Sequence, residues 1–90
     1  MSAKLGVGLL GYGLAGEFFH APLIAAEPRL ELRAIATANP ERATRAAALA
    51  PVASTDAILR DPAIGLVVVA TPNDTHHALA AAGLSAGKHV

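Results

Sequence analysis

The sequence predicts an α/β protein with a parallel β-sheet and helices on both faces of that sheet. Two observations lead to this prediction. Short apolar runs alternate with stretches of helical character along the 90 residues, and a glycine-rich turn follows the first apolar run. The resulting order is β-α-β-α-β-α-β-α-β, in which strands separated by helices pair in parallel through right-handed crossovers. The chain length allows one small domain.

The first two strands are predicted from their apolar patterns. Residues 4–10 contain a continuous apolar run that suits a buried strand. In residues 30–36, Leu and Ala at every second position alternate with Glu31, Arg33 and Ile35, and a period of two is typical of a strand. We expect these two strands to be neighbours in the sheet.

The other strands are shorter. Residues 52–53 allow a short third strand at most, residues 66–70 form a valine-rich run, and residues 88–90 open a fifth strand. A doubly wound sheet of this kind has the strand order 3-2-1-4-5, which is truncated here at the start of strand 5. Because the edge of strand 4 is then left mostly unpaired, we expect the chain to form a homo-oligomer.

The first helix is predicted over residues 14–26. Its large buried side chains are expected to be Phe18, Phe19 and Leu23. Pro22 lies inside this span, and because proline has no N–H to donate, the helix should kink or restart there.

The next two helices begin at residues that suit a helix N-cap. Asn39 caps a helix with Pro40 at its first position, and this helix runs to about Leu49. Ser54 or Thr55 caps a short helix that follows the third strand. The last helix is capped by Asn73 and ends at Gly87, in the position just past the last turn that glycine favours.

Composition excludes several classes of function. The chain is 53% apolar and 16% charged, its net charge is zero, and it has no run of like charges, so neither a nucleic-acid surface nor a membrane patch is indicated. It has no cysteine, and its four histidines lack a metal-ligand spacing with carboxylates, so no metal site is predicted. No apolar run approaches the roughly 20 residues that a membrane span needs. A reducing cytoplasm is the expected location, because five glycines between Gly6 and Gly16 disfavour a signal peptide.

The glycine-rich turn has the spacing G-x-G-x-x-G between a strand and a helix. It consists of Gly11, Tyr12, Gly13, Leu14, Ala15 and Gly16. In such a turn the first glycine allows a tight bend, the second a close approach of a phosphate, and the third close packing of helix on strand. The helix N-terminus then faces the anion. The sequence therefore predicts that a dinucleotide binds here through its pyrophosphate, with Tyr12, Leu14 and Ala15 lining the pocket or contributing N–H groups.

A second turn is expected to meet the first. Thr71, Pro72 and Asn73 follow strand 4, which is the neighbour of strand 1 at the switch point of the predicted sheet. Two turns far apart in the sequence then converge on one crevice, and this convergence strengthens the cofactor hypothesis.

The residues after strand 2 favour NADP over NAD. NAD-selective folds place Asp or Glu about 20 residues after the glycines, where it binds the ribose 2′-hydroxyl. Here the segment contains Thr37 and Asn39 and no acid, and Arg42 follows on the next helix. Thr37 or Asn39 would hydrogen-bond a 2′-phosphate and Arg42 would pair with it, although Arg42 equally suits a solvated helix face.

These motifs together resemble one family. The G-x-G-x-x-G turn, the run Phe19-His20-x-Pro22, the run Thr71-Pro72-Asn73-x-x-His76 and the closing Gly87-Lys88-His89 resemble the N-terminal domain of the Gfo/Idh/MocA oxidoreductases. The resemblance implies NAD(P)-dependent oxidation or reduction of a sugar, inositol or related polyol by hydride transfer. It also implies that Thr71, Pro72, Asn73 and His76 line the nicotinamide-ribose side, although a capped helix start explains the same residues.

The sequence also departs from this family. The family's lysine-proline pair after the fifth strand and its second α/β domain, which supplies substrate-binding and acid–base groups, are absent from the 90 residues. We therefore expect residues 1–90 to be an incomplete cofactor domain with no catalytic residue and no turnover of its own. Lys88 lies at the opening of the predicted fifth strand, before the position of the family's lysine-proline pair, and does not match the catalytic lysine.

Two other functions remain open at this point. A methyltransferase domain also begins with a glycine-rich turn, but it usually has an acid after strand 2. A non-catalytic domain that senses a dinucleotide would need no residues beyond those present.

Overall fold

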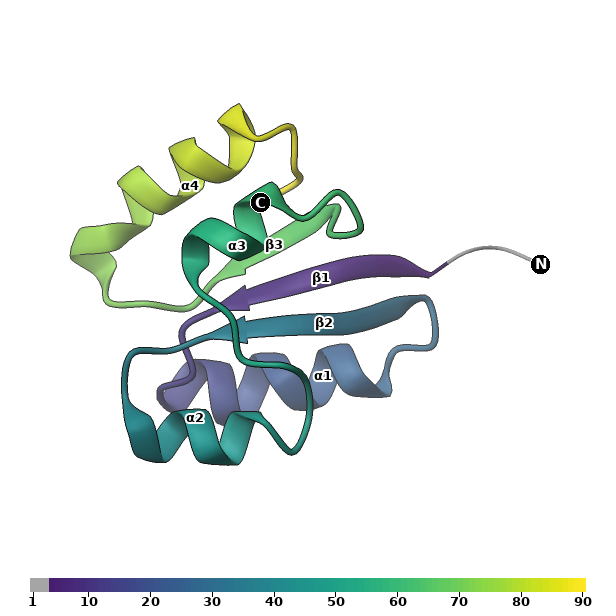
Figure 1. Ribbon diagram of the computed structural model, residues 1–90, viewed down its shortest axis with the longest axis vertical. Helices are drawn as coiled ribbons and strands as arrows, with labels where there is room; N and C mark the ends of the chain where they lie inside the picture. Colours follow the sequence, from purple (N-terminus) through teal and green to yellow (C-terminus); the bar gives the residue numbers. More distant parts are fainter. Residues whose placement is uncertain (1–3) are drawn as a thin grey trace.

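The computed structural model describes residues 4–90, which form a three-stranded parallel sheet with helices on both faces (Figure 1). A π-helical turn, η1, and a 3-10 turn, η2, accompany the strands and α-helices. The elements in chain order are β1 (Leu5–Leu10), η1 (Gly16–His20), α1 (Ala21–Ala26), β2 (Leu30–Ala36), α2 (Pro40–Ala46), α3 (Thr55–Arg60), β3 (Leu66–Val69), η2 (Asn73–Thr75) and α4 (His76–Ser85).

The strand order is β2-β1-β3, with β1 in the centre and parallel to both neighbours. A single parallel bridge joins Val52 to Ile35 of β2, and another joins His89 to Leu66 of β3. The predicted order 3-2-1-4-5 is therefore confirmed for the three central strands. At the two outer positions the structure has single bridges in place of full strands.

The pairing of β1 with β2 contains a bulge at Arg33. Val7 lies opposite Leu32 and the next residue, Gly8, lies opposite Ala34, so Arg33 has no partner on β1. A bulge of this kind shifts the residues beyond it to the other face of the strand. Leu32 and Ile35 therefore pack on the same side of the sheet, and the strict alternation predicted for residues 30–36 is wrong beyond Arg33.

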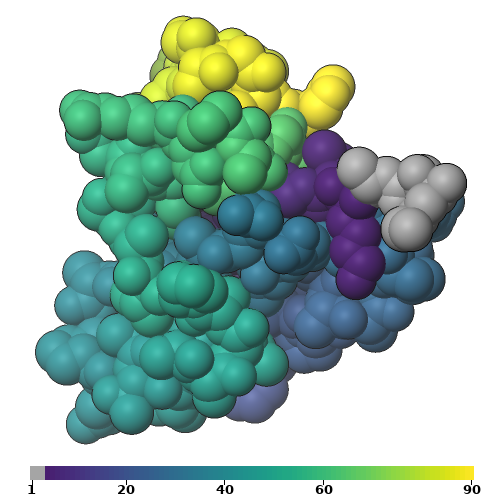
Figure 2. Space-filling model, turned by 45° about the vertical axis from the view of Figure 1, so that its right-hand side comes forward, coloured from purple at the N-terminus to yellow at the C-terminus, as the bar shows by residue number. Residues whose placement is uncertain are grey.

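The core consists of two apolar clusters, one on each face of the sheet. Leu9 and Leu10 are neighbours on β1, are both fully buried, and belong to opposite clusters. Leu9 packs with side chains from α1 and α2, whereas Leu10 packs with side chains of α3 and β3. Figure 1 shows the same layers, with α1 and α2 below the strands and α3 and α4 above them. In Figure 2, the residues of α2 (teal) lie at the bottom and the carboxyl-terminal residues (yellow) at the top.

The first helix differs from its prediction in the side chains that it buries. Phe18, Phe19 and Leu23 are 63%, 61% and 70% exposed, so their predicted burial is wrong. The buried residues of this helix are Ala21, which is small, and Ile24. A π-turn advances the chain by one extra residue per hydrogen bond, so the 3.6-residue period does not continue from η1 into α1.

Pro22 explains why the helix changes type at this point. The N–H of Ala21 donates to the carbonyl of Gly16, five residues earlier, and α1 then begins with Pro22 in its first turn. Because Pro22 has no N–H, an uninterrupted α-helix would lack a bond there. The predicted restart is confirmed.

The predicted N-caps at Asn39 and Ser54 are confirmed. Asn39 Oδ1 accepts from the amides of Glu41 and Arg42 at 3.0 and 3.1 Å, and Ser54 Oγ accepts from the amide of Ala57 at 3.0 Å. The helix capped by Asn39 ends at Ala46, earlier than predicted.

The last helix is capped differently from the prediction. Asn73 makes no side-chain capping bond, because the chain enters through η2 and α4 begins only at His76. The predicted cap at Asn73 is wrong, although the predicted end at Gly87 is confirmed. Gly87 has a φ of 80°, which glycine adopts easily, and its N–H donates to the carbonyl of Leu84 at 3.0 Å. Within residues 4–90, no helix has both the length and the apolar character to cross a bilayer.

Candidate functional site

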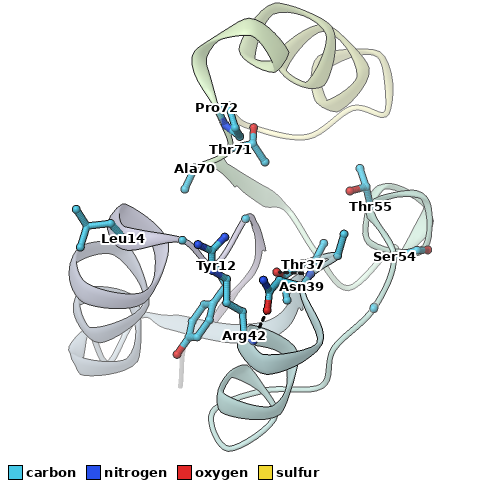
Figure 3. A pocket seen from close by; sticks show the side chains of 15 residues that line it. Tyr12, Leu14, Thr37, Asn39, Arg42, Ser54, Thr55, Ala70, Thr71 and Pro72 are labelled. Carbon is cyan, nitrogen blue, oxygen red and sulfur yellow. Dashed lines mark hydrogen bonds between the residues drawn. The ribbon is translucent and has the colours of Figure 1, made fainter.

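A cavity of about 820 Å³ lies at the carboxyl ends of the parallel strands. Its volume falls within the roughly 300–1,000 Å³ of most ligand sites. Figure 3 shows that four separate turns contribute to it. The lining residues are Gly11, Tyr12, Gly13, Leu14, Ala36, Thr37, Ala38, Asn39, Arg42, Ala53, Ser54, Thr55, Ala70, Thr71 and Pro72.

The glycine turn is held in shape by close backbone contacts. Gly11 has a φ of 100°, and a Cβ at this residue would lie 2.7 Å from the carbonyl oxygen of Ala70. A Cβ on Gly16 would collide with the carbonyl oxygen of Gly11. Only glycine fits at either position, so these two residues bring the start of the helix directly against the ends of β1 and β3.

Gly13 leaves open space beside the turn. The nearest atom to a Cβ placed there is Arg42 Nη1, at 3.7 Å. The carbonyl of Gly13 accepts the first helical hydrogen bond, from the amide of Glu17 at 2.8 Å. The amides of residues 14–16 precede that bond and have no carbonyl partner within the helix. Open space next to free amides at a helix start fits a phosphate group.

The side chain of Tyr12 points away from the cavity. It is 4% exposed and packs in the core cluster with Ala21 of α1 and Ala46 of α2. Figure 3 shows its ring directed between the helices. Burial, followed by the nearby carboxylate of Glu17, raises the pKa of the Tyr12 phenol, while the guanidinium of Arg45 lowers it. Tyr12 therefore faces the cavity with its backbone and anchors the turn with its ring.

The turn between β2 and α2 forms the wall beside Gly13. Thr37 Oγ1 accepts from the amide of Asn39 at 3.4 Å, and Asn39 Oδ1 is occupied by its two capping bonds. The side-chain amide of Asn39 remains available as a donor. Of the described residues that line the cavity, Arg42 is the charged one, and none is a carboxylate. This wall offers donors and positive charge to a ligand.

Comparison with known proteins identifies the domain. The family model GFO_IDH_MocA, described as "Oxidoreductase family, NAD-binding Rossmann fold", matches residues 5–90. The chain belongs to the Gfo/Idh/MocA oxidoreductase family. The resemblance given by the sequence motifs is thereby confirmed, the domain is an NAD-binding Rossmann domain, and the methyltransferase alternative is excluded.

Individual proteins match along nearly the whole chain. The chain is 47% identical to the uncharacterized oxidoreductase YdgJ of Escherichia coli, over 100% of its own length and 26% of that protein. It is 41% identical to the scyllo-inositol 2-dehydrogenase (NADP(+)) IolW of Bacillus subtilis, over 93% of its own length and 24% of that protein. A crystal structure of an NAD-binding protein from Listeria innocua superposes with a TM-score of 0.89 at 36% identity, over 97% of this chain and 26% of that one. The chain thus spans about a quarter of the length of the curated relatives it matches.

The structure brings most of the predicted site residues of this Gfo/Idh/MocA domain together, although not all. Four of them are absent from the cavity wall, namely Ala15, Gly16, Asn73 and His76. Gly16 lies behind the turn against Gly11, and His76 points its ring at the carbonyl of Thr71, at 2.7 Å. These two residues support the site from outside the cavity.

Sequence reasoning missed Ala53, Ser54 and Thr55, which form the wall opposite the glycine turn. Ser54 and Thr55 were predicted only as alternative caps of the short helix. The signal was present in the predicted topology, because residues 52–53 were expected to form a parallel strand beside residues 30–36, and the residues after it must border the same crevice. Among residues 4–90, no group of three or more His, Asp or Glu side chains is arranged to hold a metal ion.

Proposed function

We propose that this domain binds NADP in preference to NAD, and that a protein of full family length uses it to oxidise or reduce a polyol. The observation that carries the cofactor preference is the β2–α2 turn, where Arg42 and the free amide of Asn39 border the cavity without a carboxylate. A carboxylate there would repel a 2′-phosphate, whereas a guanidinium forms charge-assisted hydrogen bonds with it.

The pyrophosphate would lie at the glycine turn. The amides of residues 14–16 donate to it, and the missing side chain of Gly13 allows it to approach. The 2′-phosphate of the adenosine ribose would then lie beside Gly13, where Arg42 Nη1 is 3.7 Å from the position of a Cβ. The guanidinium of Arg42 would thus bind the 2′-phosphate at a position next to the pyrophosphate.

The nicotinamide half would extend toward Thr71 and Pro72, on the other side of the glycine turn from Arg42. When bound, the nicotinamide ring supplies or accepts a hydride. The residues of this domain hold and orient the dinucleotide, and the substrate groups would come from outside residues 1–90. The polyol class is supported by the name of IolW, a scyllo-inositol 2-dehydrogenase that uses NADP(+).

Fluorescence titration with NADPH and NADH tests the cofactor preference. The wild-type chain is expected to bind NADPH at least about tenfold more tightly than NADH, and Arg42→Gln to remove most of that difference by weakening NADPH alone. Arg60→Gln is the matched control, because Arg60 is an exposed cation paired with Asp56 and does not line the cavity. Tighter binding of NADH by the wild type would contradict the proposed preference.

The substrate class needs a separate assay. A protein that carries this domain at family length is expected to reduce NADP in the presence of inositols or related polyols. Intact NADPH binding without turnover of any polyol in a panel would contradict that part of the proposal.

A further inference from the structure

His76 makes a directed contact with the loop after β3. It is the first residue of α4, and its Nε2 lies 2.7 Å from the carbonyl oxygen of Thr71. A carbonyl oxygen only accepts, so Nε2 must carry the proton in this contact. The neutral ring is therefore the Nε2–H tautomer, with Nδ1 unprotonated.

Two threonines in the same loop form a second set of bonds. Thr75 Oγ1 lies 2.6 Å from the carbonyl of Pro72 and donates to it, so its proton is used there. Thr71 Oγ1 lies 2.6 Å from Thr75 Oγ1 and must be the donor in that pair. The hydroxyl of Thr71 thus has its proton engaged within the loop and offers only lone pairs to a ligand.

The loop that these bonds hold is a wall of the cavity. Ala70, Thr71 and Pro72 line the cavity, whereas Thr75 and His76 do not. The amide of Ala70 donates to Leu10 at 2.8 Å, and the carbonyl of Ala70 is the group that excludes a side chain at Gly11. The start of the loop is therefore fixed by β1, and its continuation through Thr71 is fixed by His76.

We propose that His76 is a positioning residue that holds Thr71 in place for the nicotinamide half of the cofactor. This inference rests on the proposed function. Without the imidazole, the carbonyl of Thr71 loses this donor. The hydroxyl of Thr71 keeps its contact with Thr75, but the backbone of Thr71 is held less firmly and turns away from the ligand more easily. The adenosine half, which would lie at the β2–α2 turn on the other side of Gly11, does not depend on this bond.

The test compares a whole dinucleotide with its adenosine half. NADPH and 2′,5′-ADP are titrated into the wild type, His76→Ala and His76→Gln, with His77→Ala as the control because His77 is exposed on the next position of the helix. His76→Ala is expected to weaken NADPH by about tenfold and to leave 2′,5′-ADP within about twofold of wild type. His76→Gln, whose amide N–H reaches a similar position, is expected to restore most of the affinity.

Three results would overturn the inference. One is an unchanged NADPH affinity in His76→Ala, and another is an equal loss for both ligands, which would indicate general unfolding of the site. The third is an Nδ1–H tautomer in the ¹⁵N spectrum of the wild-type ring, a measurement that needs no variant. Failure of the wild type to bind either ligand is a different outcome, because it contradicts the proposed function itself and the inference with it.

Discussion

Arg45 binds Glu17 through two parallel hydrogen bonds. Arg45 Nε lies 2.7 Å from Glu17 Oε2, and Arg45 Nη2 lies 3.1 Å from Oε1. Glu17 belongs to η1 and Arg45 to α2, so the pair joins the helix that follows the glycine turn to the helix that carries Arg42. Tyr12 is buried nearby, between the same two helices. This ion pair therefore connects the two walls that meet beside Gly13.

The ion pair should make stability depend on pH. The hydrogen bond from Arg45 lowers the pKa of Glu17 below its ordinary value. A carboxylate with a lowered pKa stabilises the fold above its unfolded-state pKa, and that contribution disappears as the pH falls through the folded-state value. Glu17→Gln is therefore expected to lower the urea midpoint at neutral pH and to match the wild type in acid. Glu41→Gln, an exposed acid on α2, is the control, and a difference for Glu17→Gln that persists undiminished in acid would contradict the assignment.

Alanine substitutions at two glycines of the turn should differ in their effects, because one should weaken only cofactor binding and the other should also lower the stability of the fold. A Cβ on Gly13 meets nothing closer than 3.7 Å, whereas a Cβ on Gly16 collides with the backbone of Gly11. Gly13→Ala is therefore expected to keep the stability of the wild type and to weaken NADPH by about tenfold or more, because the methyl group occupies the phosphate's approach. Gly16→Ala is expected to lose about 1–3 kcal/mol of stability as well. Urea unfolding and NADPH titration of both variants check this, and an equal loss of stability in both would contradict it.

Adding a carboxylate after β2 should reverse the cofactor preference. Thr37 is the first residue after β2 and lines the cavity. In Thr37→Asp the acid would accept bonds from the ribose hydroxyls of NAD and repel the 2′-phosphate of NADP. The variant is expected to bind NADH more tightly than NADPH, whereas Thr37→Asn, of the same shape without the charge, is expected not to. Competition titrations measure both, and an NADPH preference that survives in Thr37→Asp would place the 2′-phosphate elsewhere.

The features that sequence reasoning predicted correctly depend on short stretches of chain. The tight turn at Gly11, the caps at Asn39 and Ser54, and the helix end at Gly87 each follow from the conformational preference or hydrogen-bonding capacity of one residue and its near neighbours. The walls of the cavity at Thr37 and Thr71 were also predictable, because the carboxyl ends of parallel strands share one edge of a sheet.

The features that sequence reasoning missed depend on a change in the helical or strand period, or on contacts between separate elements. The π-turn before Pro22 rotates the helix, so the exposure of Phe18 and Phe19 does not follow from a period of 3.6. The bulge at Arg33 moves the residues of β2 that follow it to the other face of the strand, so their burial does not follow from a period of two. The bond from His76 to Thr71 joins a helix to the loop before it, and no pattern in the sequence distinguishes it from a direct ligand contact.

Because the aromatic side chains on η1 are exposed, removing them should change the free energy of unfolding only slightly. Phe18 and Phe19 are 63% and 61% exposed, whereas Ile24 of α1 is 6% exposed. Phe18→Ser and Phe19→Ser are each expected to change stability by no more than about 0.5 kcal/mol, as surface substitutions usually do. Ile24→Ala is expected to cost about 2–5 kcal/mol, because it leaves a cavity in the core. Urea denaturation measures all three, and a large loss in Phe18→Ser would show that this side chain is buried in solution.

The buried ammonium of Lys88 should stabilise the loop before β3. Lys88 is 7% exposed, and its Nζ donates to the carbonyls of Asp61 and Ile64 at 2.8 and 2.6 Å. Lys88→Met keeps the aliphatic chain but removes this donor from both carbonyls. The carbonyl of Asp61 is partly buried and keeps the amide of Ile64, whereas the contact at the Ile64 carbonyl is buried, so the expected cost is about 1–3 kcal/mol for that one group. Arg29→Met is the matched control, because it also removes a cation that holds a local partner, here Glu27, on an exposed surface. Since the amide of Ile64 donates to Asp61 across the same loop at 3.1 Å, hydrogen exchange at Ile64 should quicken in Lys88→Met alone. If the two variants prove equally stable and Ile64 exchanges at the wild-type rate in both, the ammonium does not hold this loop.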